Sequence, residues 1–595
     1  MNKLQYLGVG FFIAAILIFT AMLGLGHHKL SESTLEIDSR YHKAAILEAA
    51  KTEELISKEM SSIAFIPRVK EVLKAAQAIQ AEKAKAGLPD GVGEWDFKIG
   101  DWKVKEYIEA IVRSSAVGPV QKNPWLFFFL TFGLGILGGI LFIIPKFSKH
   151  PGIKNDGIYH NSMTRGVKFN IKIGVLLSTF IGIVIYGFFY SKNFFWPIVT
   201  LAIAGIIAYL VFYKHNSKDN TPQRHSCPVN TGWLGLIAGF YLIIFYVLLY
   251  WSPAYINNWI TMVSPISESL SGNASSRWFL YGLMYSIIVI VMGVRMLSKY
   301  RHNKYQRVRT ISVIFFQTII AFLLPEILVR LNQPYFDFKN IWPLQYDFFF
   351  QYNLQNLINS GGLGIFMLVW GIMLTFIGVP VITYFFGKRW YCSWVCGCGG
   401  LAETMGDPFR QLSDKSMRAW KFERYIIHGV FAAAIIMTGL VLFHYFTGKN
   451  TVLGLNSDNV KSWYGFLIGA GFSGVVGTGF YPIMGNRMWC RFGCPLAAYL
   501  GLVQRFRSRF RITTNGGQCI SCGNCSTYCE MGIDVRAYAQ KGQDIVRSSC
   551  VGCGVCSAVC PRGVLRLENA SEDIGTRTDA MRTIHITEDQ VTLLS

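Results

Sequence analysis

The 595-residue sequence is poor in charged residues, and poorest in acidic ones. Asp, Glu, Lys and Arg together make up 15% of the chain, against about a quarter in soluble domains. The 35 acidic residues face 57 Lys and Arg residues, which gives a formal net charge of +22. This scarcity of charge excludes an ordinary soluble protein. The basic excess is typical of loops beside a membrane, so we expect membrane lipid and no nucleic acid as its partner.

Long apolar runs with almost no charge recur along the chain, each near the length that a helix needs to cross a bilayer. Ten spans are predicted, roughly at 5–25, 124–145, 171–191, 194–213, 231–252, 278–298, 311–330, 363–386, 424–446 and 463–484. Every second loop between them is rich in Lys and Arg, which places these loops and both termini in the cytoplasm. We therefore predict a polytopic all-α membrane protein.

The first 360 residues divide into an anchor, a polar segment and a membrane region. Residues 1–25 are predicted to be a retained membrane anchor rather than a cleaved signal peptide, because no A-x-A site precedes "GHHKLSES". Residues 26–123 contain no cysteine and many helix formers at periodic spacing. They predict an exterior helical domain that serves as a sensor, a docking module or a spacer. Residues 124–360 hold spans two to seven.

An aromatic loop, "NQPYFDFKNIWPLQYDFFFQYN" at 332–353, is predicted to lie on the exterior side. Trp and Tyr favour the membrane interface, so an interfacial belt is the main interpretation. A binding site for a quinone head group is the alternative interpretation.

Cysteine is nearly missing from the first two thirds of the chain. Cys227 stands alone there and is expected to be inert, whereas the other thirteen cysteines lie between residues 392 and 560. A protein held together by disulfides would spread its cysteines along the chain. Clusters at CxxC spacing instead indicate metal binding on a reducing face of the membrane.

Eight cysteines form two runs in the segment 515–568, "CISCGNCSTYCEMG" and "CVGCGVCSAVCPRG". Both runs have the spacing of two-cluster bacterial ferredoxins, in which the fourth cysteine of each run binds the other cluster. The spacing predicts one [4Fe-4S] cluster on Cys519, Cys522, Cys525 and Cys560, and a second on Cys550, Cys553, Cys556 and Cys529. Structural zinc is the alternative, but zinc sites usually use two separated CxxC pairs.

The segment 515–568 is predicted to fold as a cytoplasmic α+β ferredoxin-like domain, followed by a polar, poorly ordered tail at 569–595. Glu530 follows Cys529 where the ferredoxin motif often has proline. We expect this departure to affect the local backbone and not the ligands.

The region 361–514 contains an internal duplication. "GKRWYCSWVC" at 387–396 aligns without a gap with "GNRMWCRFGC" at 485–494, and each copy follows a span. If each motif continues a helix, its two cysteines share one face, too far apart for a comfortable disulfide.

The two cysteine pairs are expected to meet in a four-thiolate site. Its members are Cys392, Cys396, Cys490 and Cys494. Four thiolates suit a third iron-sulfur cluster or another metal. Redox-active thiols and inert thiols are the alternatives. Cys398 has no counterpart in the second copy and is either a spare thiol or a substitute ligand.

These motifs resemble those of the NapH/NosR/CcoG group of membrane polyferredoxins, which combine membrane helices, two Cys-x3-Cys-Pro motifs and a cytoplasmic two-[4Fe-4S] domain. The resemblance covers about residues 360–568. "CRFGCP" at 490–495 fits the group's motif in full, whereas "CSWVCG" has Gly397 in place of proline. The threonine motif that carries FMN in NosR-like members is missing, so FMN is not expected. Bis-His haem is not expected either, because His428 and His444 point to nearly opposite faces of one span.

The resemblance implies a bacterial inner-membrane protein that passes electrons between the quinone pool, or an exterior redox partner, and a cytoplasmic partner. Relay through two clusters and the four-cysteine site is the leading hypothesis, and quinol oxidation would make the protein an oxidoreductase. A factor that reduces copper or another metal during maturation of a respiratory enzyme is the second hypothesis. A redox sensor is the third.

Overall fold

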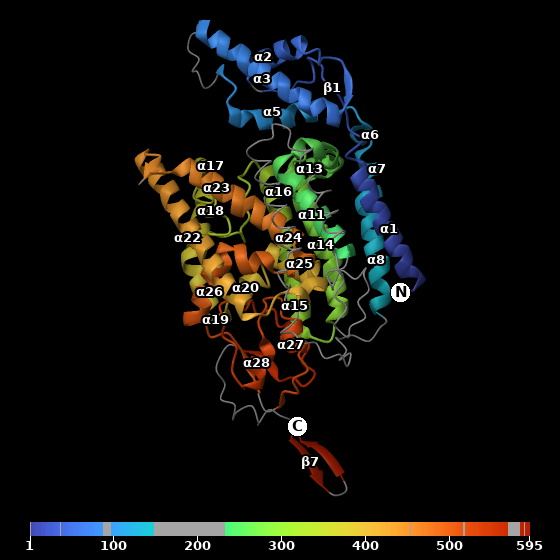
Figure 1. Ribbon diagram of the computed structural model, residues 1–595, viewed down its shortest axis with the longest axis vertical. Helices are drawn as coiled ribbons and strands as arrows, with labels where there is room; N and C mark the ends of the chain where they lie inside the picture. Colours follow the sequence, from blue (N-terminus) through green and yellow to red (C-terminus); the bar gives the residue numbers. More distant parts are fainter. Residues whose placement is uncertain are drawn as a thin grey trace.

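The computed structural model describes residues 2–35, 37, 39–86, 97–147, 233–452, 454–515, 518–568, 583–587 and 590–594. An N-terminal helical domain lies at one end of the long axis, a bundle of long helices in the middle, and a cysteine-rich domain at the other end (Figure 1). The expected spans at 171–191 and 194–213, and Cys227, lie outside the described residues.

Six helices in the described part of the chain are long and apolar enough to cross a membrane. They are Lys3–Ala21, Pro124–Pro145, Arg277–Lys299, Lys304–Arg330, Gly361–Phe386 and Met417–Thr447. A seventh candidate is bent by 111° between Ile237–Trp251 and Pro253–Met262, because proline has no N–H to continue the preceding helix. Seven of the ten predicted spans therefore have a counterpart in a helical membrane bundle.

Several of these spans combine α-helical and π-helical segments. The elements of the first half are α1 (Lys3–Ala21), α7 (Pro124–Phe128), η1 (Phe129–Gly133), α8 (Leu134–Phe147), α11 (Trp233–Trp251), η3 (Pro253–Ile256), α12 (Asn257–Met262), α13 (Ser264–Ser271) and α14 (Arg277–Lys299). The next are α15 (Lys304–Phe315), η4 (Phe316–Leu323), α16 (Leu324–Arg330), α17 (Gln351–Asn359), α18 (Gly361–Met373), η5 (Leu374–Gly378), α19 (Val379–Phe386) and α22 (Met417–Thr447).

The tenth expected span, 463–484, is not one uninterrupted apolar helix. After the short strands β3 (Thr451–Val452) and β4 (Leu455–Asn456), the chain forms α23 (Ser457–Tyr464), η7 (Gly465–Val476), α24 (Gly477–Gly479) and α25 (Tyr481–Met484). Its glycines serve close packing against α11: a β-carbon at Gly474 would lie 2.7 Å from Tyr250 and 2.8 Å from Tyr246. The segment is thus helical from Ser457 to Gly479 and breaks at Phe480, where Pro482 helps to start a new turn. It is not among the helices that are long and apolar enough to cross a membrane, so this span stays a prediction.

The aromatic loop 332–353 folds into the bundle instead of forming a belt at its surface. Trp342, which is 8% exposed, stacks on Phe376 with ring centroids 6.2 Å apart. Phe376 lies near the middle of the span Gly361–Phe386. The indole nitrogen of Trp342 also donates a hydrogen bond to Thr438 Oγ1 (3.0 Å). The loop is therefore re-entrant, and the belt interpretation was wrong.

The N-terminal helical domain, residues 26–123, has the helical character that was predicted. Its elements are β1 (His27–Lys29), α2 (Arg40–Thr52), β2 (Glu59–Ser61), α3 (Ser62–Ala86), α5 (Asp101–Ser114) and α6 (Pro119–Lys122). The apolar faces of α2, α3 and α5 form a core of their own. His28 lies against this core, stacked on Phe65 at 4.9 Å and hydrogen-bonded to Ser62 Oγ at 2.9 Å.

Acidification is expected to destabilise this domain through His28. Burial lowers the pKa of His28 from 6.5 to about 4, so the folded domain keeps the imidazole neutral while the unfolded chain takes up a proton. Stability should fall as the pH drops from about 6.5 to about 4, by about 3 kcal/mol in total. Hydrogen exchange of the α2 amides in the intact protein measures this loss. The variant His28→Gln should show a flatter pH profile, and an equally steep profile would contradict the prediction.

The cysteine-rich domain is closed by a small antiparallel sheet. Strand β5 (Arg511–Thr514) pairs with β6 (Leu565–Glu568), which brings the two ends of the domain side by side. Between them lie α27 (Asn524–Thr527), α28 (Val535–Gln540) and α29 (Val555–Ala558). This is the α+β character expected of a ferredoxin-like domain. The tail, expected to be poorly ordered, contains a hairpin of β7 (Thr583–Thr587) and β8 (Gln590–Leu594).

Candidate metal centres

The eight cysteines of the C-terminal domain line two small cavities, each of about 20 Å³. The first cavity is lined by Cys519, Cys522, Cys525 and Cys560, and the second by Cys550, Cys553, Cys556 and Cys529. The last cysteine of each run thus lies at the cavity of the other run. This crossed arrangement is typical of two-cluster ferredoxins.

The two runs take the same path around their cavities. Ser521 and Gly552 occupy equivalent positions and have φ angles of +58° and +61°. Gly523 and Gly554, also at positive φ, then start α27 and α29. This left-handed turn brings three thiols of a run to one side of the chain. Glycine adopts it freely, whereas Ser521 pays about 1–2 kcal/mol.

Each donor set consists of four cysteine thiols. Within the described residues, no three Cys, His, Asp or Glu side chains converge closely enough to hold one metal ion. Burial raises the pKa of Cys525 to about 12 and that of Cys550 to about 11. These thiols therefore become thiolates when a metal centre replaces the proton. Four thiols around one cavity are the donors that a [4Fe-4S] cluster requires.

The two cavities differ in their exposure. Cys519, Cys522 and Cys560 of the first cavity are partly exposed, and the neighbouring Ile520 is 49% exposed. The second cavity is walled by buried apolar side chains of Ile512, Met531, Ile533, Val535, Ile545 and Val551. The first cavity therefore lies near the surface, and the second lies deeper in the protein.

Helix α15 of the membrane bundle binds the loop that lines the second cavity. The hydroxyl of Tyr305 donates a hydrogen bond to the Gly552 carbonyl at 2.8 Å. Gln306 and Arg309 both donate to the carbonyl of Cys553, at 2.8 and 3.0 Å. The second cavity is thus attached directly to the membrane helices.

The two copies of the repeat share one backbone path. Gly387 and Gly485, with φ angles of +64° and +92°, end the preceding helices. A short turn follows, which is α20 (Arg389–Cys392) in the first copy and η8 (Trp489–Gly493) in the second. Helices α21 (Gly397–Thr404) and α26 (Pro495–Arg507) then begin.

The second cysteine of each pair is the N-cap of the helix that follows. The sulfur of Cys494 accepts a hydrogen bond from the Ala497 backbone N–H at 3.4 Å, and Cys396 has the same extended backbone at its helix start. An N-cap residue has an extended backbone, which interrupts the helix. The condition that a helix continues through each cysteine pair is therefore not met.

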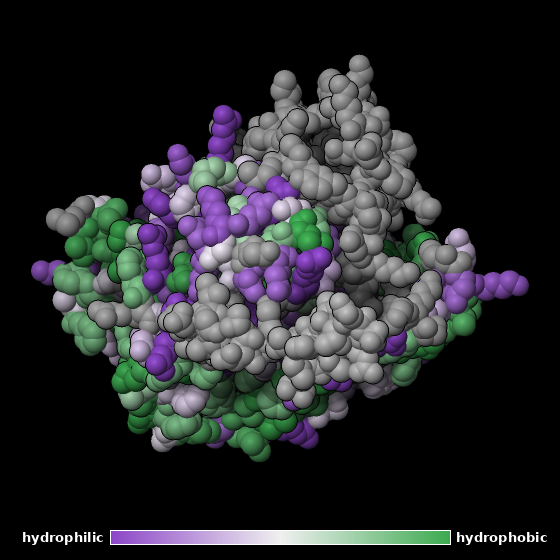
Figure 2. Space-filling model, turned by 90° about the horizontal axis from the view of Figure 1, so that it is seen from below, coloured by the Kyte–Doolittle hydropathy of each residue, from purple (hydrophilic) through white to green (hydrophobic). Residues whose placement is uncertain are grey.

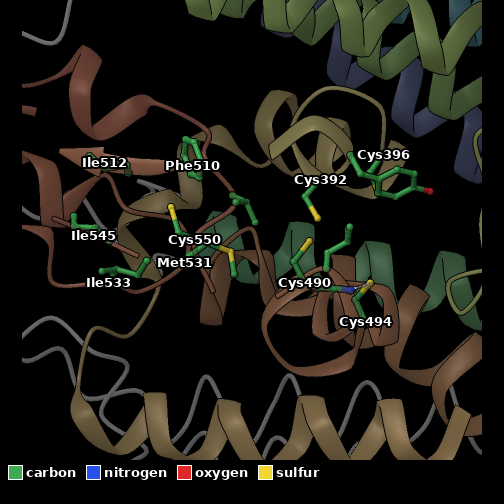
Figure 3. Packing of buried hydrophobic residues seen from close by; sticks show 14 of the residues in the cluster. Cys392, Cys396, Cys490, Cys494, Phe510, Ile512, Met531, Ile533, Ile545 and Cys550 are labelled. Atoms are coloured by element: carbon green, nitrogen blue, oxygen red, sulfur yellow. Dashed lines mark hydrogen bonds between the residues drawn. The ribbon is translucent and has the colours of Figure 1, made fainter. Parts of the chain in front are cut away.

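All four cysteines of the repeat nevertheless come together (Figure 3). Cys392, Cys396, Cys490 and Cys494 are all buried. The sulfurs of Cys392 and Cys490 face each other (Figure 3). Burial raises the pKa of Cys392 to about 12. Cys398 lies beside the site, with its thiol hydrogen-bonded to Cys396.

Gly397 replaces the expected proline without shifting the start of the helix. Helix α21 begins at Gly397 just as α26 begins at Pro495. A β-carbon at residue 397 would lie 2.6 Å from Oε1 of Gln317 in η4. Glycine therefore allows the first copy to approach the membrane helix.

The re-entrant loop reaches this four-cysteine site and carries an ion pair that the sequence analysis missed. The hydroxyl of Tyr391 donates a hydrogen bond to the Lys339 carbonyl at 2.9 Å. The ammonium of Lys339 pairs with Asp337 at 3.1 Å, with side chains 10% and 18% exposed. Its positive charge is close enough to Cys396 and Cys398 to interact electrostatically with both thiols. Charged side chains at membrane depth are rare and usually functional.

A buried ion-pair network joins the repeat to the C-terminal domain. The carboxylate of Glu530 is bound by Arg410 at 2.7 Å and by Arg487 at 2.9 Å. Glu403 is bound by Arg309 at 2.7 Å and also by Arg487. Burial raises the pKa of Glu530, but its two arginines outweigh burial and lower the pKa to about 2. The expectation that Glu530 affects the local backbone and not the ligands stays a prediction, and the structure adds its place in this ion-pair network. The feature of the sequence that could have revealed this role is an acidic residue at a position where the ferredoxin motif often has proline.

Two models of iron-sulfur domains match this part of the chain. A 4Fe-4S binding domain matches residues 368–416 and again 464–513, once on each copy of the repeat. A 4Fe-4S dicluster domain matches residues 511–561. The chain thus carries ferredoxin-type 4Fe-4S domains over these residues.

Two known proteins are similar to the chain. The putative electron transport protein YccM of Escherichia coli (strain K12) is 27% identical over 172 residues, 27% of this chain and 47% of YccM. The methylamine utilization ferredoxin-type protein MauN of Paracoccus denitrificans (strain Pd 1222) is 28% identical over 187 residues, 29% of this chain and 60% of MauN. The chain spans about half the length of these curated relatives. No solved structure matches it.

Proposed function

We propose that the protein is an integral membrane electron carrier that links a donor in or outside the membrane to a cytoplasmic partner. The observation that supports this most is the crossed placement of eight thiols around two cavities, one of which is bonded to the membrane bundle. [4Fe-4S] clusters held there supply one-electron transfer. The ligands are those predicted, with Cys560 completing the first set and Cys529 the second.

The three sites differ in their distance from the protein surface, and this difference supports an order for the proposed relay. The four-cysteine site lies against the bundle, the second cavity is enclosed, and the first opens near Ile520 at the surface. We place a soluble acceptor or donor at that surface. Hydrophilic residues gather at the centre of this end of the molecule (Figure 2), which is typical of a face in water.

We assign the protein to a bacterial inner membrane, with both termini and the cluster domain in the cytoplasm. The basic loops support this orientation, and the resemblance to NapH/NosR/CcoG polyferredoxins supports the location. A quinol or an exterior redox protein is the proposed membrane-side partner. The ten-span topology belongs to the same proposal.

Iron and sulfide quantitation under anaerobic conditions, with EPR during a redox titration, tests the function. Two clusters give about eight irons per chain, and a third [4Fe-4S] cluster in the repeat gives about twelve. A content near twelve that falls to about eight in the variant Cys490→Ala assigns the third cluster to the repeat. A content near eight leaves the repeat thiols to metal handling or thiol chemistry. A reconstituted protein without [4Fe-4S] signals would contradict the relay.

A further inference from the structure

Arg487 contacts the four-cysteine site directly and the second cavity through Glu530, which lines that cavity. Its guanidinium is 3.6 Å from the sulfur of Cys490 and donates a hydrogen bond to the Cys392 carbonyl at 3.2 Å. The same guanidinium binds Glu530 at 2.9 Å. Glu530 directly follows Cys529, which lines the second cavity. One positive charge is therefore shared by two thiol sites.

Water has little access to the network around Arg487. Its central members are Arg309, Arg410, Arg487, Glu403, Asp407 and Glu530, all at most 4% exposed. Arg295 and Lys299 add two positive charges through Asp407, at 3.1 and 2.8 Å. Five basic groups thus meet three acidic ones, and buried charges of this kind are weakly screened. The surplus is positive, the sign that complements thiolate-bound iron-sulfur centres, which become more negative on reduction.

Glu530 holds the C-terminal domain against the repeat with both its side chain and its backbone. Asn486 donates to its carboxylate at 3.2 Å, and the hydroxyl of Ser413 donates to its carbonyl at 2.7 Å. Arg410 and Arg487 complete its shell. Removal of one partner from a buried ion pair is strongly destabilising. These contacts make the domain a fixed part of the membrane core instead of a mobile carrier.

We propose that Arg487 and Glu530 are positioning residues that couple the redox state of the four-cysteine site to that of the second cluster. Arg487 favours the reduced form at both sites through its positive charge. Glu530 holds Arg487 in place and offsets part of that charge beside Cys529. This inference rests on the proposed function, because it requires redox centres at both sets of thiols.

EPR-monitored redox titration of the full-length protein tests the coupling. In Arg487→Gln, loss of a positive charge should move the midpoint potentials of both centres to more negative values. In Glu530→Gln, which keeps the shape and loses the negative charge, the second centre should move to more positive values. Opposite shifts from the two sides of one ion pair cannot arise from loosened packing, which would affect both variants alike.

Two further variants separate the effect of charge from the effect of packing: a control that removes a charge elsewhere and a variant that keeps the charge of Arg487. Asp544→Asn removes one negative charge from the exposed surface of the same domain and should leave both potentials unchanged, because water screens that site. Arg487→Lys keeps the charge and should stay close to the wild type even if Glu530→Gln fails to fold. Shifts of equal sign in Arg487→Gln and Glu530→Gln, or a shift at one centre alone, overturn the coupling. A wild type without [4Fe-4S] signals overturns the proposed function as well, whereas unshifted signals overturn the coupling alone.

Discussion

Replacement of Cys560 by alanine should abolish the first cluster and leave the second intact, although Cys560 belongs to the second cysteine run. Cys560 lines the first cavity together with the first three cysteines of the other run. A [4Fe-4S] cluster that loses one of its four thiolates is expected to be lost or degraded, so the iron content should fall by about four per chain. EPR of the reduced protein should show that Cys560→Ala and Cys522→Ala lose the same signal.

The reciprocal variant is Cys529→Ala, which should lose the same signal as Cys553→Ala. Cys398→Ala is the control, because Cys398 lies at the repeat and lines neither cavity. It should keep both ferredoxin-type signals. If Cys560→Ala and Cys556→Ala lost one signal in common, the runs would each bind their own cluster and the crossed assignment would be wrong.

The placement of these eight cysteines was within reach of the sequence because their spacing is local. Three thiols of a run lie within seven residues, so a single left-handed turn brings them together. The fourth thiol is brought to the other cavity by the two-fold similarity of the runs, which the matching spacing already reveals. The apolar spans were predictable for the same reason, since their signal lies in about 20 consecutive residues.

The ion pairs of Glu530 could not be predicted from the residues near it in the sequence. Its partner Arg410 lies 120 residues away in the sequence, and no periodic pattern connects two such positions. The sequence showed that a proline had been replaced by an acid, but not what the acid meets. A buried carboxylate requires buried cations, and only the assembled repeat supplies them.

The helix break at each cysteine pair was not predicted because cysteine is not a usual N-cap. Ser, Thr, Asp and Asn are common N-caps and mark a helix start in the sequence. Cysteine, which is the N-cap of both helices here, gives no such signal. The glycines at 387 and 485 were the better signal, since glycine commonly follows the end of a helix. Both glycines were known only as matching positions of the two copies of the repeat.

The re-entrant loop escaped prediction because its composition has two explanations. Aromatic residues beside a span are typical of an interfacial belt, but the same rings fill the interior of a bundle equally well. What separates the two cases is the tertiary contact of Trp342 with Phe376 and Thr438. Asp337 and Lys339 belong to the same loop and are therefore buried with it. Their ion pair offsets part of the cost of burying the two charges.

Removal of the acid from that pair should be among the most destabilising single changes in the protein. Asp337→Ala leaves the ammonium of Lys339 uncompensated at 10% exposure, and breaking a buried pair in this way costs about 3–5 kcal/mol. Thermal unfolding of the purified protein in detergent should therefore begin at a clearly lower temperature. The double variant Asp337→Asn with Lys339→Met removes both charges and should recover most of the loss.

The matched control is the exposed pair of Asp458 and Lys461, whose side chains are 49% and 38% exposed. Asp458→Ala should change stability by no more than about 1 kcal/mol, because water solvates the remaining lysine. If Asp337→Ala were as harmless as Asp458→Ala, Lys339 would have to reach water, and the loop could not enter the bundle. Since the same ammonium faces Cys396 and Cys398, a large loss in Asp337→Ala accompanied by altered thiol reactivity at the repeat would tie the fold of the loop to the chemistry of the four-cysteine site.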